Sequence, residues 1–338
     1  MKKVVTLGEI MLRLSTHTGE RLSQTNKLTM HYGGAEANVS VALSRFGYDV
    51  YFISKVPNNP LGEAVERHLK SHGVYTDYLL KGGERLGTYY LESGVGERSA
   101  KVIYDRKYSS FSNLTLEELD LEGIFEGAAL FHVSGITLAL SPYLRKLTML
   151  ALQKAKAYGI QTSFDFNYRA TLWSQKEASQ AIKPLLPYID ICFCGELDAM
   201  YLLDIPTADA SLTKTEKLEY YYRKIKEMYP NIRYMSSTFR TVQSASNHKL
   251  QGNLYVNGEL YQSKEHHIDQ IVDRVGGGDA FASGVLHGIL LGTLPPEQII
   301  SFAIAASALK HTVHGDCNVF SVEEISQFVD HGSAKIMR

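Results

Sequence analysis

The sequence predicts an α/β fold in which helices cover both faces of a mostly parallel sheet, and two observations support this prediction. Short β-rich runs alternate with longer amphipathic stretches along most of the chain. This alternation is typical of a parallel sheet in a three-layer α/β/α sandwich. Residues 15–32 and 87–104 contain no helical pattern, and the second region alternates as a pair of strands does. We therefore expect a small second β sheet that forms a lid beside the main sheet.

The main sheet is predicted from short runs rich in β-branched and aromatic residues. Strands are expected at residues 4–7, 50–53, 129–133, 161–164, 189–193 and 232–235. Helices are expected between them, at residues 35–46, 62–72 and 141–158. The third helix begins with Ser141-Pro142, a pair that suits an N-cap and a first helical residue. Residues 250–263 are predicted to form a hairpin that turns at Asn257-Gly258.

The length of 338 residues suits a single α/β domain over residues 1–338, with lid segments at about residues 12–32 and 87–106 inserted in it. The formal net charge of -1 provides no overall basic field for nucleic acid or an anionic membrane. No apolar run is long enough for a signal peptide or a membrane-spanning helix. We therefore expect a cytoplasmic protein whose partners include neither nucleic acid nor a membrane.

Several common classes of site are not supported by the sequence. Three scattered cysteines do not make a disulfide framework, and Cys192 and Cys194 suit a buried strand as small apolar thiols. The twelve histidines show no metalloprotease spacing. No Gly-Lys-Ser/Thr triplet is present, and no Gly-x-Gly-x-x-Gly follows the first strand, which argues against a P-loop ATPase and a dinucleotide dehydrogenase.

The run Gly276-Gly277-Gly278-Asp279 precedes a helical pattern over residues 280–291. Consecutive glycines leave backbone N–H groups unobstructed, and the start of a helix attracts anions such as phosphate. Asp279 would then be a carboxylate beside an anion hole, placed to take a proton from an attacking hydroxyl. The alternative is that Asp279 only stabilises the helix terminus by its charge, which is worth about 0.3–1 kcal/mol.

A second glycine pair, Gly33-Gly34, precedes the helix expected at residues 35–46. Two glycines at this place allow a ligand to approach the backbone closely. Asn38 lies about one turn inside the helix, where its amide would bind ligand hydroxyls or hold the glycine loop. The alternative is an ordinary helix start with an incidental Asn.

Together the two motifs resemble those of the ribokinase-like (PfkB) carbohydrate kinases, and the resemblance covers nearly the whole chain. Within that family the sequence is most similar to the 2-keto-3-deoxygluconate kinases, through residues 6–14, 33–38, 104–107, 165–169 and 315–316. The resemblance implies a ribokinase-like sandwich and ATP-dependent phosphorylation of the terminal (6-) hydroxyl of 2-keto-3-deoxygluconate, giving 2-keto-3-deoxy-6-phosphogluconate. It also implies Mg²⁺ and a homodimer through the β lid or a higher homo-oligomer, and it leaves a monovalent cation such as K⁺ open.

The resemblance also implies roles for individual residues. The catalytic set would be Asp279 with Gly276, Gly277 and Gly278. The sugar-binding set would be Gly33, Gly34, Asn38, Tyr89, Tyr104, Arg106, Arg169 and Asp316. The nucleotide-binding set would be Asn167, Arg169, Lys107, Ser237, Arg240, Gly276 and Gly278, and Glu196 and Asp198 would hold Mg²⁺ through water. Because guanidinium groups bind carboxylates in pairs of hydrogen bonds, Arg106 and Arg169 would hold the acid group of the sugar.

Some positions depart from the family pattern. Arg13 stands where many members have an Asp that binds sugar hydroxyls, and this favours an acidic sugar over a neutral one. Residues 195–198 replace an Asn-x-x-Glu motif, and residues 236–240 replace the usual nucleotide turn. Arg274 stands where a small residue or Pro is usual. Two alternatives therefore stay open: a kinase for fructose, 2-keto-3-deoxygalactonate or a nucleoside, and a non-catalytic protein that binds sugar or nucleotide.

Overall fold

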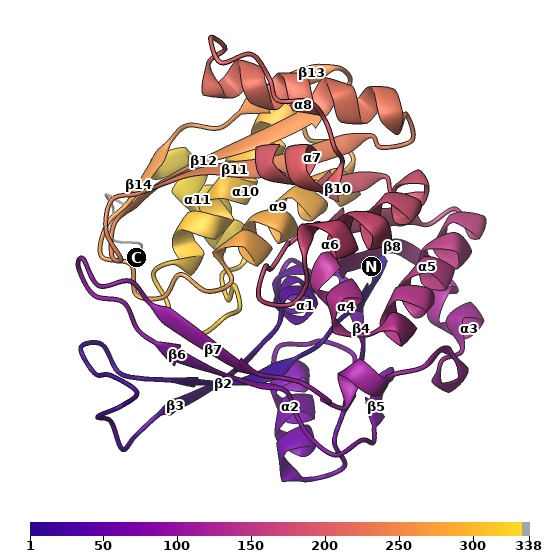
Figure 1. The fold of residues 1–338 in the computed structure, drawn as a ribbon, viewed down its shortest axis with the longest axis vertical. Helices are drawn as coiled ribbons and strands as arrows, with labels where there is room; N and C mark the ends of the chain where they lie inside the picture. Colours follow the sequence, from indigo (N-terminus) through magenta and orange to yellow (C-terminus); the bar gives the residue numbers. More distant parts are fainter. Residues whose placement is uncertain (333–338) are drawn as a thin grey trace.

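The computed structural model describes residues 1–332, in which the main sheet has ten strands. Their bounds are β1 (Lys3–Leu7), β4 (Asp49–Val56), β5 (Leu79–Lys81), β8 (Ala128–Ser134), β9 (Gln161–Asp165), β10 (Ile191–Phe193), β11 (Tyr234–Val242), β12 (His248–Val256), β13 (Glu259–Gln262) and β14 (His266–Ile268). The strand order is β13-β12-β11-β10-β9-β8-β1-β4-β5, with β14 paired to β12. Pairing is parallel from β11 to β5 and antiparallel for β12, β13 and β14, so the sheet is mostly parallel, as predicted (Figure 1).

Both faces of the main sheet are buried, because successive side chains of a strand point to opposite faces. In β1, Val5 belongs to the core on one face and Val4 to the core on the other. The first face is covered by α3 (Leu121–Phe125), α4 (Gly135–Leu140), α5 (Pro142–Ala157), α6 (Gln175–Ile182), α7 (Glu196–Leu202) and α8 (Lys214–Met228). The second is covered by α1 (Ala35–Arg45), α9 (Gly277–Leu291), α10 (Pro296–Lys310) and α11 (Val322–His331). The fold is therefore the three-layer α/β/α sandwich that the alternation predicts (Figure 1).

Local signals determine where two important helices begin. Ser141 caps α5 by accepting a hydrogen bond from the Leu144 N–H (3.2 Å), and Pro142 is the first helical residue. Helix α9 begins at Gly277, three residues before the predicted start. Gly276 precedes it with a left-handed φ of 80°, a conformation that glycine adopts without strain. The glycine run thus supplies the N-cap and the first helical residues.

Most strands differ from the predicted ranges by a few residues, and two of the differences have a clear cause. Strand β10 begins at Ile191 rather than residue 189, because the 3-10 helix η3 (Lys183–Tyr188) ends just before Ile189, whose N–H still donates to the Leu186 carbonyl (3.1 Å). Strand β11 runs to Val242 rather than residue 235, because it pairs with β12 along its whole length. Residues 236–240, which were expected to form an atypical nucleotide turn, are therefore part of a strand.

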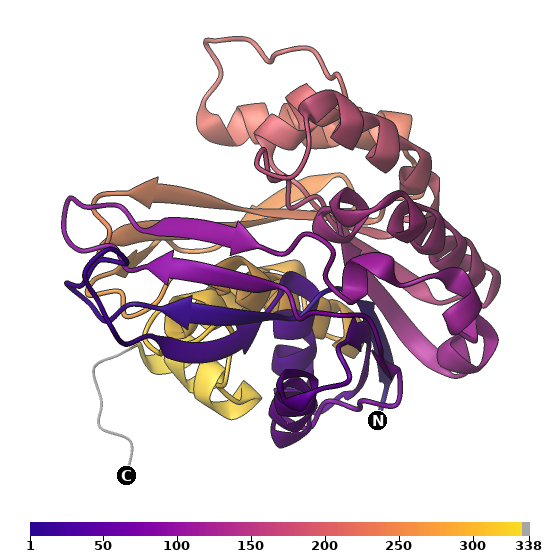
Figure 2. The same ribbon diagram turned by 60° about the horizontal axis from the view of Figure 1, so that its bottom comes forward.

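A second sheet lies beside the main one and has the strand order β3-β2-β6-β7. Its strands are β2 (Met11–Ser15), β3 (Thr29–Gly33), β6 (Thr88–Glu92) and β7 (Lys101–Asp105), so each predicted lid segment supplies two strands. The sheet extends outward next to the turns of the β11–β12 hairpin (Figure 2). There the Ala245 N–H donates a hydrogen bond to the Gly96 carbonyl (2.8 Å).

The base of the small sheet is anchored to the main domain by a third apolar cluster. Leu12 of β2 belongs to this cluster together with Phe52 of β4 and with Val65 and Leu69 of α2 (Pro60–Ser71). Residues at the base of the lid are therefore buried. The outer strand differs, since all five residues of β7 are exposed.

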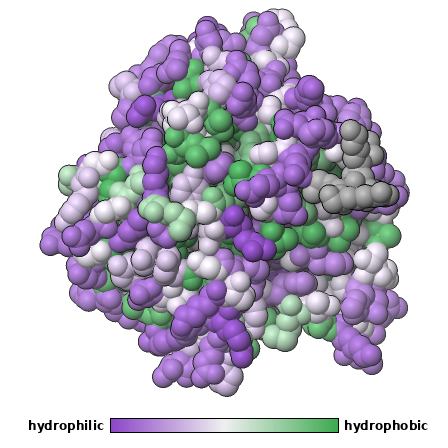
Figure 3. Space-filling view, turned by 180° about the vertical axis from the view of Figure 1, so that it is seen from behind, coloured by the Kyte–Doolittle hydropathy of each residue, from purple (hydrophilic) through white to green (hydrophobic). Residues whose placement is uncertain are grey.

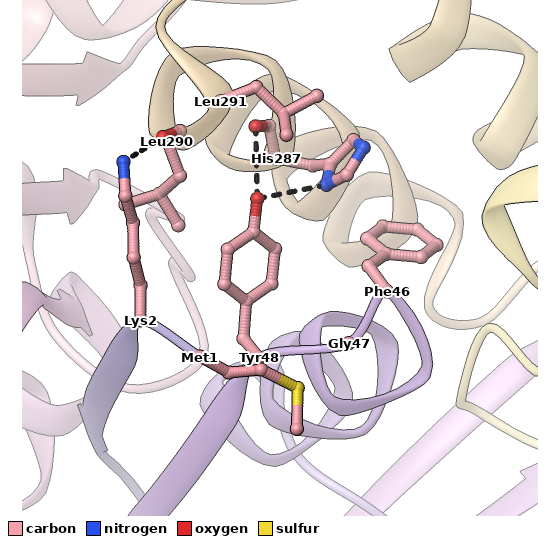
Figure 4. A pocket seen from close by; sticks show the side chains of 8 residues that line it. All are labelled: Met1, Lys2, Phe46, Gly47, Tyr48, His287, Leu290 and Leu291. Atoms are coloured by element: carbon pink, nitrogen blue, oxygen red, sulfur yellow. Dashed lines mark hydrogen bonds between the residues drawn. The ribbon is translucent and has the colours of Figure 1, made fainter.

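The rear face of the molecule carries mostly hydrophilic side chains, with hydrophobic groups confined to small areas (Figure 3). No helix within residues 1–332 is long and apolar enough to cross a membrane. A hollow of about 270 Å³ lies at the amino end of β1, where the Tyr48 hydroxyl is 3.0 Å from His287 Nδ1 and Lys2 Nζ donates to the Leu290 carbonyl (Figure 4). Because open α/β sheets bind ligands at the carboxyl ends of their strands, this hollow is at the wrong edge for the main site.

Candidate active site

A cleft of about 970 Å³ opens at the carboxyl ends of β9, β10 and β11, between the main sheet and the small sheet. Its walls include these residues from the predicted sets: Gly33, Gly34, Asn38, Tyr89, Tyr104, Arg106, Asn167, Arg169, Glu196, Asp198, Ser237, Arg240, Gly276, Gly277, Gly278, Asp279 and Asp316. Lys107 is the exception, because it is exposed and does not line the cleft. The fold thus brings together segments that are up to about 280 residues apart in the sequence.

Asp279 lies in the first turn of α9 and faces the cleft. Its Oδ2 accepts a hydrogen bond from Asn38 Nδ2 at 2.6 Å. Burial raises the pKa of Asp279 to about 6, although the Asn38 hydrogen bond and the charge of Arg169 oppose that rise. Asn38 Oδ1 also accepts from the Gly34 N–H (3.3 Å), so Asn38 joins the glycine pair to the carboxylate. A carboxylate with this pKa suits a general base.

The start of α9 presents free backbone donors to the cleft. The Gly277 N–H donates to the Arg274 carbonyl (3.4 Å), whereas the N–H groups of Gly278 and Asp279 have no backbone acceptor within residues 1–332. A Cβ atom on Gly278 would meet nothing within 4 Å, which shows that this residue borders open space. Free amides at the positive end of a helix are a binding site for an anion.

Three arginines line the same cleft: Arg169, Arg240 and Arg274. None of them forms a salt bridge with a residue in the described part of the chain. Burial lowers the pKa of Arg240, and the positive charges of Arg274 and Arg169 lower it further, which shows that the three lie close enough to repel one another. Unpaired guanidinium groups gathered in a cleft are suited to a polyanion such as a triphosphate.

An apolar region adjoins the arginines. Leu218 and Phe239 line the cleft there, and Lys214 Nζ lies 4.0 Å from the centre of the Phe239 ring. Ser237 is held by the Tyr222 hydroxyl, which lies 2.8 Å from Ser237 Oγ. This combination offers a surface on which an aromatic base can stack beside the cluster that suits phosphates.

Acidic side chains also line the cleft, at the ends of β9 and β10. Both oxygens of Asp165 accept hydrogen bonds from Asn167, one from its backbone N–H and one from Nδ2, each at 3.1 Å. Burial, followed by the charge of Asp279, raises the pKa of Asp165 to about 8. Asp198 accepts from the Gly195 N–H (2.8 Å), and burial raises its pKa to about 6.

Most of the charged groups on the lid side of the cleft form ion pairs with one another. Arg106 Nε donates to Glu9 Oε2 at 2.8 Å and Nη2 donates to the same oxygen, and both residues are buried. No atom within residues 1–332 accepts a hydrogen bond from Arg106 Nη1, so this donor remains for a ligand. The Arg106 guanidinium also lies 5.7 Å from the centre of the Tyr104 ring, which borders the cleft.

Arg13 does not act as the sequence suggested. It is buried, does not line the cleft, and donates from Nη2 to Asp273 Oδ2 (2.6 Å) and from Nη1 to Asp316 Oδ1 (2.7 Å). Asp316 also accepts a hydrogen bond from the Tyr89 hydroxyl. The position of Arg13 therefore gives no direct information about the charge of the ligand, because its own charge is already compensated.

The comparisons with known proteins agree with this geometry. The family described as pfkB family carbohydrate kinase matches residues 1–323. The chain belongs to this family. A 2-dehydro-3-deoxygalactonokinase from Haloferax volcanii is 34% identical to it, covering 99% of both chains.

Solved structures give the same result for the pfkB family kinase. A 2-dehydro-3-deoxygluconokinase from Thermotoga maritima is 41% identical, with a TM-score of 0.94, and the match covers 98% of this chain and 100% of that one. A PfkB family carbohydrate kinase from Listeria grayi is 44% identical, with a TM-score of 0.93, covering 97% of this chain and 100% of that one. The protein is therefore a sugar kinase, a phosphotransferase with an alcohol group as acceptor, and it has the ribokinase-like fold.

Several residues of the kinase cleft were not predicted from the sequence. Asp165 is the last residue of β9, and an acid at the carboxyl end of a parallel strand is a recognisable signal for a site at the edge of the sheet. Arg274 was noted only as unusual, but it completes the arginine cluster. Lys214, Leu218 and Phe239 carried no local signal, because only the paired β11–β12 hairpin and α8 bring them to the cleft.

Proposed function

We propose that this kinase uses ATP to phosphorylate the terminal (6-) hydroxyl of 2-keto-3-deoxygluconate, the compound also called 2-dehydro-3-deoxygluconate. The observation that carries the proposal is the Arg106 guanidinium, which Glu9 holds in the wall of the cleft with Nη1 left free. Arg169, Arg240 and Arg274 line the same cleft without an ion pair in the described part of the chain. A sugar acid carries a carboxylate at one end, which Arg106 of the lid would bind, and a terminal hydroxyl at the other, which would meet Asp279 in the same cleft. The relative from Thermotoga maritima supports the same acceptor.

The mechanism is a direct in-line transfer. Asp279 takes the proton of the terminal hydroxyl as its oxygen attacks the γ-phosphorus, and Asn38 holds the carboxylate in place. The N–H groups of Gly278 and Asp279 stabilise the charge on the phosphoryl group that moves. Arg169, Arg240 and Arg274 bind the remaining phosphates, and the lid excludes water from the reacting groups.

Mg²⁺ fits the acidic side of the cleft as an ion bound through water. Within residues 1–332 no group of three His, Cys, Asp or Glu side chains can hold a metal ion directly. Asp165, Glu196 and Asp198 line the cleft and would bind waters of the ion. When bound, Mg²⁺ neutralises charge on the phosphates of the nucleotide.

The second candidate acceptor is 2-keto-3-deoxygalactonate, which differs from the first sugar acid only in the configuration at C4. The relative from Haloferax volcanii favours it. Arg106 serves either acid equally, since both carry the same carboxylate. A neutral ketose or a nucleoside would offer no carboxylate to the free Nη1 donor of Arg106, and a non-catalytic role would leave the raised pKa of Asp279 without a use.

A coupled ADP-release assay tests the proposal. The acceptors are the two sugar acids, fructose, ribose and adenosine, each with ATP and Mg²⁺. We expect kcat/KM for 2-keto-3-deoxygluconate to exceed that for every neutral acceptor by at least about 100-fold, the size of one well-placed charged hydrogen bond. Equal or higher kcat/KM for a neutral sugar would overturn the acidic acceptor, and turnover of the galactonate alone would select the second candidate.

The pH dependence of the reaction should reflect the pKa of Asp279. The base must be ionised to accept a proton, and burial has raised its pKa to about 6. We therefore expect kcat/KM to fall about tenfold per pH unit as the pH drops below about 6. The profile is measured in mixed buffers of constant ionic strength. Asp198, whose pKa is also about 6, is the control, since an Asp198→Asn variant should keep this acid limb. If the Asp198→Asn variant loses the acid limb, the limb belongs to Asp198.

The exposed outer strand β7 leads us to propose a homodimer formed through the lids. Val102, Ile103 and Tyr104 are each at least 40% exposed in this outer strand, whose free edge can pair with another chain. An Ile103→Glu substitution should shift the protein to the monomer in light scattering with size-exclusion chromatography. Val329→Glu, at an exposed apolar residue of α11, should leave the mass unchanged. A dimer that survives Ile103→Glu would place the interface elsewhere.

A further inference from the structure

Lys310 is the last residue of α10 and has no exposed surface. Lysines are almost never fully buried unless their ammonium groups are paired. Lys310 Nζ donates to two main-chain carbonyl oxygens, those of Asp273 (3.2 Å) and Val313 (3.4 Å). Lys310 does not line the cleft, so contact with a substrate does not explain its presence.

The two carbonyl groups belong to the two segments that support the start of α9. Residues 273–276 lead directly into the helix, and residues 313–316 end at Asp316, which lines the cleft. The segments touch at Gly276, where a Cβ atom would lie only 1.7 Å from the Asp316 carbonyl oxygen. Asp273 adds a second link, because its Oδ2 accepts from the Gly315 N–H (3.1 Å). The ammonium group therefore links the two segments that support the anion-binding start of α9.

Lys310 also balances the charge of this buried region. Arg13 lies between Asp273 (2.6 Å) and Asp316 (2.7 Å), so these three residues together leave one negative charge uncompensated. Burial lowers the pKa of Lys310, while Asp273 and Asp316 favour its charged form. Removing the ammonium group would leave buried carbonyl oxygens and a buried negative charge without a partner, and such a region attracts a cation from solvent.

We propose that Lys310 is a positioning residue whose ammonium group serves as a built-in monovalent cation for the phosphoryl-transfer site. Main-chain carbonyl oxygens that converge on one point are the arrangement by which proteins bind K⁺. Here a side chain of the same protein fills that point and keeps the amides of Gly278 and Asp279 in place. The wild-type kinase therefore needs no added monovalent cation. This inference rests on the anion-binding role proposed for the start of α9, but it does not depend on which sugar is the acceptor.

The first test uses the unmodified enzyme with whichever acceptor gives turnover. The kcat is measured in chloride salts of K⁺, NH₄⁺, Na⁺ and tetramethylammonium at equal ionic strength, with Mg²⁺ and ATP constant. We expect the four values to agree within about twofold, because the cation site is already filled from within the chain. Activation by K⁺ or NH₄⁺ of about fivefold or more over tetramethylammonium would overturn the inference, since the required cation would then come from solvent.

The second test removes the ammonium group. Lys310→Ala should lower kcat by about 10–30-fold while changing the KM of the sugar by less than about threefold, because the site is displaced but the sugar contacts remain. Added NH₄⁺ or K⁺ should raise the kcat of this variant by at least about fivefold. Tetramethylammonium should not raise it, because only small cations fit the space. Lys156→Met is the control: Lys156 lies in the last turn of α5 and pairs with Asp190, remote from the cleft.

The outcomes separate positioning from simple stabilisation. A kcat unaffected by Lys310→Ala, or a loss that no cation restores in a protein with the wild-type melting temperature, would overturn the inference. If Lys310→Ala does not fold, the salt series on the wild-type enzyme decides alone. Failure of the proposed kinase mechanism itself is recognised separately, because an Asp279→Asn variant would then retain its turnover.

Discussion

Replacement of Asp279 by Asn is expected to lower kcat by about 10³-fold, because a positioned general base contributes about 10²–10⁴-fold. The new side chain has the same shape and its oxygen can still accept from Asn38 Nδ2, which lies 2.6 Å from Asp279 Oδ2 in the wild type. It cannot take up the hydroxyl proton. The KM for the sugar should change by less than about threefold, since the sugar contacts lie elsewhere in the cleft. The coupled ADP-release assay gives both constants.

A matched control separates catalysis from helix stabilisation. Glu297 is also an acid in the first turn of a helix, α10, but it is exposed and lies outside the cleft. Glu297→Gln should keep kcat within about twofold, because a charge at a helix start contributes only about 0.3–1 kcal/mol to stability. Similar kinetics for Asp279→Asn and Glu297→Gln would show that Asp279 only stabilises its helix.

The same Asp279→Asn variant should melt at a higher temperature than the wild type. The pKa of Asp279 in the folded protein is raised to about 6. The protonated carboxyl therefore stabilises the fold fully below the pKa of the unfolded state, and this stabilisation is lost as the pH rises through about 6. Above that pH the folded protein carries a carboxylate in an unfavourable place, and Asn removes that charge. A lower melting temperature at neutral pH would contradict this account.

Much of the fold could be predicted because it depends on local pattern. The strand–helix alternation fixed the class, and Ser141-Pro142 marked the start of α5 to within one residue. The hairpin turn at Asn257-Gly258 was also confirmed, with β12 ending at Val256 and β13 beginning at Glu259. The extension of β11 to Val242 was not predictable, because it is stabilised by pairing with a strand that begins at His248 and not by its own composition.

The residues of the candidate site also divide into those that a local pattern predicts and those that depend on distant contacts. Asp279, its glycines and Asn38 belong to short motifs, and the structure brings them together in one cleft. The ion pairs depend instead on contacts between distant residues, such as Arg13 with Asp316, which are 303 positions apart. No local pattern reports whether an arginine faces a ligand or a buried carboxylate. For this reason the presence of Arg13 was taken to favour an acidic sugar, whereas Arg274, which does line the cleft, was left out of the predicted site.

The pairing of Arg106 with Glu9 changes how the sugar carboxylate is tested. Both side chains are buried, so removing Arg106 alone would leave Glu9 unpaired, which costs about 3–5 kcal/mol of stability. A raised KM in that variant would then have two explanations. A cycle of Arg106→Met, Glu9→Gln and the double variant resolves them, because the double variant removes both charges together.

The double variant should raise the KM of the sugar acid by about 30–100-fold while raising that of fructose by less than about threefold, because only the acid loses a charged hydrogen bond. Glu9→Gln alone should not weaken binding of the acid, since Arg106 then no longer shares its charge with a carboxylate. Arg85→Met is the control, because Arg85 pairs with Asp105 on the exposed side of the lid (2.7 Å) and should leave both KM values unchanged. If the double variant weakens the acid and fructose equally, Arg106 supports the lid and does not recognise the carboxylate. In that case the cations left to bind the acid group are those of the arginine cluster, and the orientation of the sugar in the cleft would have to be reversed.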